Sequence, residues 1–451
     1  MKKQKELLFN ASEFGENFTW GVSTAAYQIE GAYDSHGKGP SIWDTFTALP
    51  KAIRKRENAK VSCDFYHKYK EDILLMKSMN IDNYRFSISW SRVLPNGTGT
   101  INEVGLQFYN DVINFCLAQE ITPWVTLYHW DLPQSLEEKG GWTNRAIIQW
   151  FSEFTKVCAN AFGDRVKNWM VLNEPMVFTG AGYFLGVHAP GKKGLKNFMP
   201  AAHHAVLCQA EGGRILRKLV PNANIGTTFS CSQITSYREN NRDKKTAVKV
   251  DALLNRMFIE PALGLGYPIK EAPVLKKLQS YIKPNDMINC KFDFDFIGIQ
   301  NYTREKVKYS LLVPYIRAKI VKASKRNVKT TLMDWEVYPP SIYNMIEKFS
   351  NYPQIKKLII TENGAAFKDK LEGENIIDDE RVHFLQRYLH QVLKAKQDGL
   401  NIHGYFVWTF TDNFEWAEGY YPRFGLVYVD FKTLKRTIKK SGKWFSEFLA
   451  S

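Results

Sequence analysis

The sequence lacks the features of several large classes of protein. It contains no run of about 18 apolar residues, so we expect no membrane-spanning helix. The first residues, MKKQKELLFNASEF, include only a short apolar stretch, too short for the core of a signal peptide. The six cysteines form no CxxC pair and do not cluster with histidines at metal-ligand spacing. We therefore expect reduced structural thiols, no metal, no cofactor and a cytoplasmic location.

Acidic residues are also comparatively few, since 46 of them stand against 61 lysines and arginines and leave a net charge of +15. Such a charge raises the question of a nucleic acid or an anionic membrane as partner. The basic runs at 51–60, 304–329 and 432–443 are interrupted by apolar residues and contain no nucleic-acid-binding motif. We interpret them as solvated surface and expect neither nucleic acid nor membrane as a partner. Nothing in the sequence indicates an oligomeric state.

No Gly/Ser-rich or Pro-rich linker divides the 451 residues, so we expect one domain over 1–451. Short β-prone segments occur at 18–23, 83–89, 122–129, 168–172, 225–230, 294–300, 358–361 and 404–408. Amphipathic stretches between them, such as 66–79, 144–161 and 379–396, are typical of helices. This alternation predicts an α/β fold that is either doubly wound or a closed barrel, and eight similar strands favour a (β/α)8 TIM barrel.

Several of these segments end in side chains that would be costly in a plain core: Arg85, His129, Asn173 with Glu174, Tyr302, Glu362 and Trp408. The active sites of such barrels lie at the C-terminal ends of the strands. Six strands that end in this way therefore indicate one shared pocket.

Two of these residues, Glu174 and Glu362, each follow a strongly apolar strand. Two carboxyl groups across a cleft suit glycoside hydrolysis, in which one protonates the leaving oxygen and the other attacks the anomeric carbon or activates water. Each glutamate taken alone could equally form a structural ion pair or a helix cap.

Six segments together resemble the family 1 glycoside hydrolases. They are TAAYQIEGA at 24–32, NYRFSISWSR at 83–92, LYHWDLPQ at 127–134, LNEP at 172–175, ITENG at 360–364 and DNFEWAEGYYPRFGLVYVD at 412–430. They span nearly the whole chain in the family's order. The resemblance implies a retaining β-glycosidase with Glu174 as general acid/base and Glu362 as nucleophile.

Physical chemistry agrees with these roles. Arg85 and the Tyr302 hydroxyl would stabilise the charge of Glu362 and lower its pKa, whereas burial beside a second carboxylate would raise the pKa of Glu174. For a retaining enzyme we expect the two carboxyl groups roughly 5 to 5.5 Å apart.

The resemblance also implies a set of residues that bind the substrate. Gln28, His129, Asn173 and Glu415 match those that bind the hydroxyls of the non-reducing sugar, with Asn173 on the 2-hydroxyl. Trp408 would stack beneath the sugar ring, and Trp416 would donate its indole N–H. Trp335 would form a wall on the aglycone side, with Trp130 and Phe424 completing the pocket. Gln28 and His129 could instead be satisfied core groups, and Trp335 could be ordinary loop packing.

The substrate class follows from positions that separate the family's subgroups. The subgroup that cleaves 6-phospho-sugars has Ser, Lys and Tyr where this chain has Glu415, Pro422 and Phe424. A carboxylate would repel a phosphate by about 4 kcal/mol at 4 Å in an effective dielectric of 20. The thioglucosidase subgroup has Gln at the position of Glu174. We therefore expect hydrolysis of unphosphorylated β-D-glucosides, with β-galactosides and β-fucosides as further substrates.

The chain departs from the family pattern at Gln300, where Asn is usual, at Ser91, where Pro is usual, and at 409–411, where Ser-Leu-Leu is usual. None of these changes removes a catalytic group, but Gln300 places an extra methylene near the sugar pocket. A transglycosidase would share every residue named above, and a non-catalytic sugar-binding relative would typically lack one of the two glutamates. The loop between 303 and 335 shapes the aglycone site, and its basic sequence raises the question of acidic aglycones.

Overall fold

The computed structural model describes residues 9–451 and contains a closed barrel of eight parallel strands. The barrel order is β1-β13-β10-β7-β5-β4-β3-β2, and pairing of β1 with β2 closes it. The strands are β1 (Thr19–Ser23), β2 (Asn83–Ser87), β3 (Thr122–Tyr128), β4 (Asn168–Asn173), β5 (Asn224–Ser230), β7 (Phe296–Gln300), β10 (Leu358–Asn363) and β13 (Ile402–Trp408). The predicted (β/α)8 barrel is confirmed, and each strand overlaps its predicted segment. Residues 1–8 lie outside the described residues. They make up most of the N-terminal segment MKKQKELLFNASEF, for which we expected no signal peptide.

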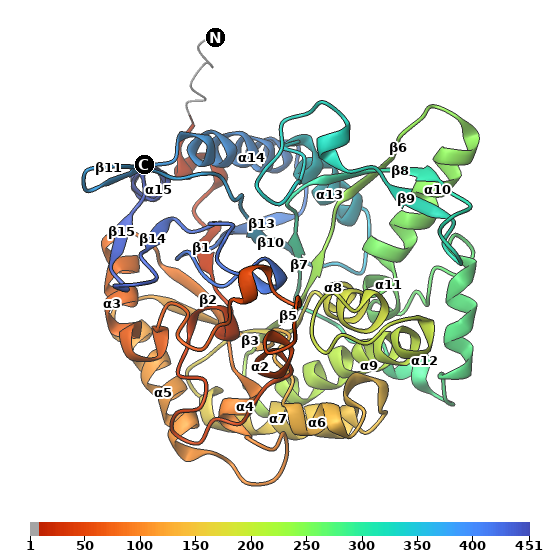
Figure 1. The fold of residues 1–451 in the computed structure, drawn as a ribbon, viewed down its shortest axis with the longest axis horizontal. Coiled ribbons are helices and arrows are strands. Elements are labelled where there is room, and N and C mark those ends of the chain that lie inside the picture. The colour runs from red at the N-terminus through yellow and green to blue at the C-terminus, as the bar shows by residue number, and fades with distance from the viewer. Residues whose placement is uncertain (1–8) are drawn as a thin grey trace.

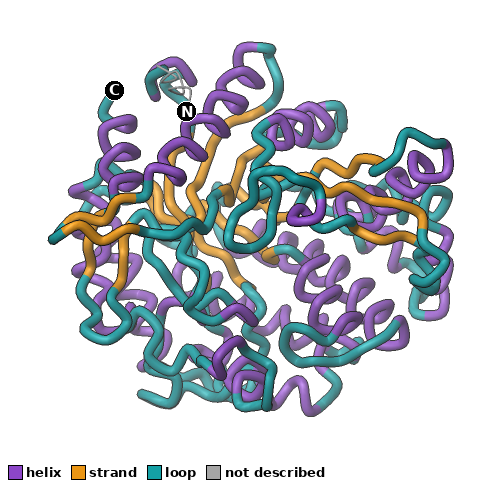
Figure 2. The backbone as a smooth tube through the Cα atoms, turned by 45° about the horizontal axis from the view of Figure 1, so that its top comes forward, coloured by secondary structure: helices purple, strands orange, loops and turns teal. Residues whose placement is uncertain are grey.

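Helices surround this barrel, as Figures 1 and 2 show. The longer ones are α3 (Phe65–Ser78), α5 (Glu103–Ala118), α7 (Ile147–Phe162), α9 (Leu195–Leu219), α10 (Asn241–Asp251), α13 (Pro340–Ser350), α14 (Asp379–Gln397) and α15 (Lys440–Leu449). The short ones are α1 (Ala26–Ile29), α2 (Ile42–Thr47), α4 (Trp90–Val93), α6 (Gln134–Glu138), α8 (Pro175–Thr179), α11 (Ile259–Ala262) and α12 (Asp286–Asn289). The predicted helices at 66–79, 144–161 and 379–396 correspond to α3, α7 and α14. Apolar side chains between barrel and helices form the largest core.

A second, smaller core fills the inside of the barrel. It consists of Trp124, Met170, Phe296, Ile359 and Phe406, which come from five different strands. Glycines opposite the two phenylalanines make room for their rings. A Cβ at Gly21 would lie 2.4 Å from the Phe406 ring, and a Cβ at Gly226 would lie 2.3 Å from the Phe296 ring. The barrel is therefore a packed core rather than a pore, and its polar groups lie above this layer.

Three small sheets lie outside the barrel. β6 (Gln233–Ser236), β8 (Arg304–Tyr309) and β9 (Ala318–Ile320) form one sheet, which extends away from the barrel beside α10 (Figures 1 and 2). The hairpins β11 (Lys370–Glu372) with β12 (Asn375–Ile377) and β14 (Val427–Val429) with β15 (Arg436–Ile438) form the other two. The sheet that contains β8 lies in the region that the sequence analysis treated as a basic loop.

A buried ion network ties the loop after β13 to the C-terminal part of the chain. The Lys439 ammonium lies 2.7 Å from Asp369 and 2.7 Å from Asp412, and it is fully buried. Asp412 also accepts from Arg423 at 2.6 Å, and Asp369 accepts from Arg381 at 3.0 Å. The loop that begins at Asp412 is thus fixed at its base by charge-assisted hydrogen bonds.

Candidate active site

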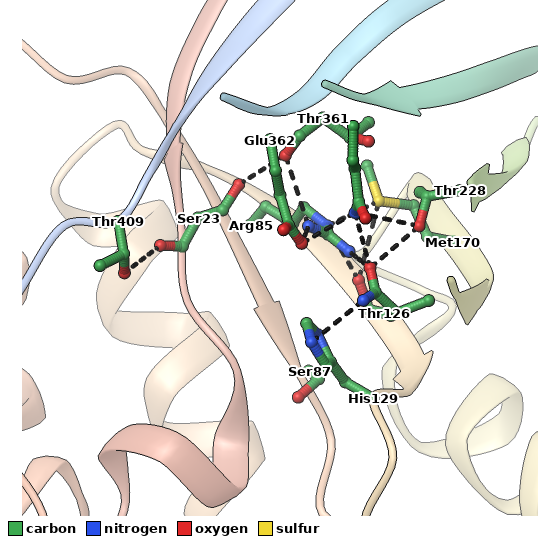
Figure 3. Close-up of polar contacts among 12 residues, drawn as sticks. Ser23, Arg85, Ser87, Thr126, His129, Met170, Thr228, Thr361, Glu362 and Thr409 are labelled. Atoms are coloured by element: carbon green, nitrogen blue, oxygen red, sulfur yellow. Dashed lines mark hydrogen bonds and ion pairs between the residues drawn. The ribbon is translucent and has the colours of Figure 1, made fainter. Parts of the chain in front are cut away.

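Arg85 lies at the centre of a polar network above the barrel core. It comes from β2 and is fully buried. Its guanidinium pairs with Glu362, donates to the Asn173 side chain, and donates from Nε to Thr126 at 3.2 Å and to the Met170 sulfur at 2.9 Å. Figure 3 shows Arg85 between Glu362 on one side and Thr126 and Met170 on the other. Because each of its nitrogens has a partner, the guanidinium is held in one orientation.

Glu362 is the second-last residue of β10, and its carboxyl accepts three hydrogen bonds. The donors are Arg85, the Tyr302 hydroxyl at 2.6 Å and the Gln300 amide at 2.8 Å. Burial raises the pKa of Glu362, while Arg85 and Tyr302 oppose that effect. We expected these two residues to lower the pKa below its ordinary value. They do act in that direction, but the cost of burial is larger.

Gly364, two positions after Glu362, lets β13 approach the end of β10 closely. A Cβ at Gly364 would lie 1.8 Å from the backbone carbonyl oxygen of Trp408, so no side chain fits there. This close approach brings the end of β10 next to the end of β13.

Glu174 follows the last residue of β4 and has a left-handed backbone with φ 45°. Burial raises its pKa well above the ordinary value, and the nearby charge of Glu362 raises it further. Hydrogen bonding from Ser230 and the charge of Arg85 oppose these effects. As the pH rises, Glu362, which has three hydrogen-bond donors, therefore ionises first. The carboxyl of Glu174 keeps its proton at that pH.

Both glutamates line a pocket of about 460 Å³. The other expected site residues in its wall are His129, Tyr302, Trp335, Trp408, Glu415, Trp416 and Phe424, and Trp130 lies beside them. Gln28, Arg85 and Asn173 are not in the wall, but each contacts a residue that is. The structure thus brings all thirteen expected residues to one place.

His129 and Asn173 form a pair whose proton positions follow from their partners. The Asn173 oxygen accepts from Arg85, from Gln300 at 2.7 Å and from Thr228 at 2.9 Å, so its nitrogen is the donor to His129 Nε2 at 3.0 Å. A nitrogen that accepts this bond has no proton. His129 is therefore neutral, in agreement with the lowering of its pKa by burial and by Arg85.

Gln28 and Glu415 form a second pair. The Gln28 amide donates to the Phe414 carbonyl at 2.9 Å, to Asn413 at 3.2 Å and to Glu415 at 3.4 Å. Within residues 9–451, Gln28 Oε1 and His129 Nδ1 are buried without a hydrogen-bond partner. Buried polar atoms of this kind are costly unless they bind something, and a sugar hydroxyl would satisfy each.

The charge of Glu415 differs from our expectation. Burial and the charge of Glu362 raise the pKa of Glu415 to about 8, so its carboxyl is largely protonated at neutral pH. The expected repulsion of a phosphate by this carboxylate therefore does not apply at pH 7. The preference for unphosphorylated sugars rests instead on the absence of a clamp at Pro422 and Phe424.

Aromatic rings form the remaining wall. The Trp335 ring lies 5.1 Å from Tyr302 and 6.0 Å from Phe424, between ring centroids. On the other side, Trp416 lies 4.5 Å from Trp130 and 5.9 Å from His129. Flat apolar rings beside hydroxyl-binding groups suit the two faces of a sugar.

Several pocket residues were missed by sequence reasoning. Ser230 ends a correctly predicted strand, so the same strand-end argument would have found it. Gln300 was noted only as a departure, yet it donates to both Glu362 and Asn173. Glu305 and Met333 lie in the loop between 303 and 335 that we expected to shape the aglycone site, but neither was singled out, and no sequence signal marked His188 and Asn255.

Three further results concern the described residues as a whole. Within 9–451, no group of three or more His, Cys, Asp or Glu side chains is arranged to hold a metal ion. All six cysteines are free and buried. None of the helices in this part of the chain is long and apolar enough to cross a membrane.

Comparison with known proteins identifies the family. The sequence model of glycosyl hydrolase family 1 matches residues 10–451. The chain belongs to glycosyl hydrolase family 1. It is 42% identical over 442 residues to a 1,4-beta-D-glucan glucohydrolase of Thermotoga neapolitana, with 97% of this chain and 98% of that protein covered. It is 41% identical to beta-glucosidase A of Thermotoga maritima over 97% of this chain and 98% of the relative.

Solved structures of family 1 enzymes show the same fold. A Thermotoga maritima family 1 glycoside hydrolase, complexed with a cyclophellitol analogue transition state mimic, matches with a TM-score of 0.93 at 40% identity over 98% of this chain and 99% of that one. The beta-glucosidase from the same organism in complex with glucoimidazole matches with a TM-score of 0.92 at 40% identity, covering 97% and 98%. This family 1 enzyme is therefore a glycosidase of the retaining β-glucosidase type.

Proposed function

We propose that this family 1 enzyme hydrolyses β-D-glucosides by double displacement, with Glu362 as the nucleophile and Glu174 as the acid/base. The observation that carries the assignment is the difference between the two carboxyl environments. Glu362 accepts hydrogen bonds from Arg85, Tyr302 and Gln300, whereas the charge of Glu362 adds to burial in keeping Glu174 protonated. A site that separates two carboxyl pKa values in this way has one base and one acid.

In the first step the Glu362 carboxylate attacks the anomeric carbon, while the Glu174 proton moves to the glycosidic oxygen and the alcohol leaves. In the second step Glu174, now ionised, takes a proton from water, and the resulting oxygen attacks the same carbon and releases Glu362. Two inversions give net retention. This mechanism needs the two carboxyl groups roughly 5 to 5.5 Å apart, and that spacing stays a prediction.

The sugar is proposed to lie between Trp408 and the hydroxyl-binding groups. Gln28, His129 and Glu415 would bind hydroxyls remote from the reaction, and Asn173 would bind the 2-hydroxyl. The partnerless Gln28 Oε1 and His129 Nδ1 support this arrangement. Trp416 would add its indole N–H, and Trp335 with Phe424 would contact the leaving group.

The first test is hydrolysis of p-nitrophenyl β-D-glucoside, β-D-galactoside and 6-phospho-β-D-glucoside by the wild-type protein and by Glu362→Gln. The matched control is Glu374→Gln, because Glu374 is exposed in the turn between β11 and β12. We expect turnover of the unphosphorylated sugars by wild type and by the control, and none by Glu362→Gln. Turnover of the phosphorylated substrate alone would contradict the proposed substrate class.

The roles of the two glutamates are separated by azide rescue. We expect Glu362→Ala to be inactive until azide is added and then to form the α-glycosyl azide, since azide takes the nucleophile's place and attacks once. We expect Glu174→Ala to keep activity on substrates with good leaving groups and to form the β-glycosyl azide. The opposite products would reverse the assignment. Products are identified by NMR.

We also propose that residues 1–451 form a single catalytic domain in a cytoplasmic protein. The family match across 10–451 and a barrel that pairs β1 with β13 support one domain. Six free, buried thiols support a reducing compartment. Asn301 begins an Asn-x-Thr glycosylation sequence, Asn301-Tyr302-Thr303, and its buried side chain supports a location without glycosylation. Subcellular fractionation of the native host tests the location.

A further inference from the structure

Within residues 9–451, the pocket wall contains glutamates but no basic residue other than histidine. Five glutamates line the pocket, at 174, 305, 362, 415 and 418, and the lining contains no lysine or arginine among the described residues. The protein as a whole carries a net charge of +15. Because Glu174 and Glu415 keep their protons at neutral pH, the charge of this pocket depends on the remaining glutamates, and Glu305 is the one of these that lies on the aglycone side beside Trp335.

Arg304 and Arg326 are absent from the wall of the main pocket but line a smaller cavity that adjoins its aglycone side. Arg304 makes two hydrogen bonds to Glu336, at 2.9 and 2.8 Å, and stacks on the Tyr338 ring. Arg326 also donates to Glu336, at 2.5 Å. Both guanidinium groups are thus committed to one buried carboxylate. Of the described basic segment between 303 and 335, no lysine or arginine lines the main pocket, while Lys322 lines the adjoining cavity together with these two arginines.

Glu305 differs from the other carboxyl groups outside the catalytic pair. It lies on β8 and lines the pocket together with Ile320, Met333 and Trp335, on the aglycone side. Glu418 pairs with Arg54, and Glu415 accepts from Gln28. The Glu305 side chain has no hydrogen bond or ion pair with any other part of residues 9–451. It is therefore available to whatever occupies this side of the pocket.

The charges around Glu305 come from three neighbouring side chains. Burial raises the pKa of Glu305 to about 7, Arg326 opposes this effect, and Glu336 and Asp334 add to it. The carboxyl is thus ionised above neutral pH, and a cation or hydroxyl donor beside it would be stabilised. A second negative charge there would be repelled.

We propose that Glu305 selects the leaving group, disfavouring β-glucosides with an anionic aglycone and favouring those whose aglycone carries a cationic or hydroxyl group beyond Trp335. This selection rests on the proposed glucosidase function, because it concerns the second half of the same substrate. Glu305 is a binding residue in this proposal and takes no part in bond cleavage.

The test uses three aryl β-D-glucosides that differ only at the end of a short saturated arm on the ring: a carboxylate, a hydroxyl or a trimethylammonium group. The arm keeps the leaving-group acidity equal, so the ratio of kcat/KM values reports binding of the arm. We compare wild type, Glu305→Gln, Glu305→Lys and the surface control Glu374→Gln at about pH 8, above the pKa of Glu305. Melting temperatures establish that each variant is folded.

We expect wild type to prefer the cationic and hydroxyl substrates. In Glu305→Gln the kcat/KM of the anionic substrate relative to the hydroxyl substrate should rise roughly tenfold, and in Glu305→Lys it should rise further. The ratio in Glu374→Gln should equal that of wild type. An unchanged ratio in folded Glu305→Gln, with the hydroxyl substrate still cleaved, would overturn the selection alone. Failure of wild type to cleave the hydroxyl substrate would overturn the glucosidase function and this selection with it.

Discussion

Replacing Tyr302 with phenylalanine removes one hydrogen bond from Glu362 and leaves the ring in place. The Tyr302 hydroxyl lies 2.6 Å from Glu362 Oε2. Burial and the charges of Glu362 and Glu174 raise the pKa of Tyr302 well above its ordinary value, so the hydroxyl keeps its proton and acts as the donor. It stabilises the ionised form of Glu362 and not the protonated form.

A hydrogen bond to a charged group contributes about 1.5 to 3 kcal/mol. Since a pKa unit corresponds to about 1.4 kcal/mol, loss of this bond should raise the pKa of Glu362 by about 1 to 2 units. The acidic limb of the pH profile of kcat/KM reports the first ionisation of the free enzyme's carboxyl pair. We therefore expect this limb to move to higher pH in Tyr302→Phe, by about 1 to 2 units.

The assay is hydrolysis of p-nitrophenyl β-D-glucoside between about pH 4 and 9, with initial rates at low substrate concentration. Tyr343→Phe is the matched control, because the Tyr343 hydroxyl donates to the exposed Asp398 carboxylate at 2.7 Å, in a bond of similar length outside the pocket. Its profile should coincide with that of wild type. An acidic limb of Tyr302→Phe that stays at the wild-type position would refute the proposed stabilisation of Glu362 by Tyr302.

Two further predictions concern stability. Lys439→Met should lower the free energy of unfolding by about 3 to 5 kcal/mol, because it leaves the buried Asp369 and Asp412 without their shared cation. Urea denaturation measures this free energy. Lys443→Met is the control, because Lys443 is exposed and its replacement should change the free energy of unfolding little. Burial lowers the pKa of His204 to about 4, so between pH 7 and 5 the unfolded chain binds a proton there that the folded chain does not. Wild type should therefore lose about 2 kcal/mol of stability relative to His204→Gln over this interval, and a pH-independent difference between them would contradict the argument.

The barrel could be predicted from the sequence because its pattern is local. Each strand is a short apolar run, and the segments 168–172 and 358–361 were recognised although β4 and β10 continue to Asn173 and Asn363. The sheet of β6, β8 and β9 was not predicted. Its strands are short and incompletely buried, and β6 pairs with β8 across a long stretch of intervening chain, which no local pattern indicates.

The candidate site likewise contains residues that the sequence predicts and residues whose role only the structure reveals. Glu174 and Glu362 follow apolar strands, and a strand-end argument finds them without a structure. The role of Gln300 depends on two partners from different strands, Asn173 and Glu362, which no local pattern reveals. The pKa of Glu415 and the isolation of Glu305 depend on which charges surround them in space, and neighbouring residues in the sequence did not indicate those charges.

The pairing of β1 with β13 also means that the barrel can be completed only after nearly the whole chain has been synthesised. Thr19–Ser23 is made early, but its partner Ile402–Trp408 is made near the end, together with Glu415, Trp416 and Phe424. Until then β1 has an unpaired edge, and the inner core lacks Phe406. Such late, long-range pairing slows folding and exposes the nascent chain to aggregation. We expect synthesis arrested before β13 to yield chains that engage chaperones and have no glucosidase activity, even though Glu174 and Glu362 have already been made.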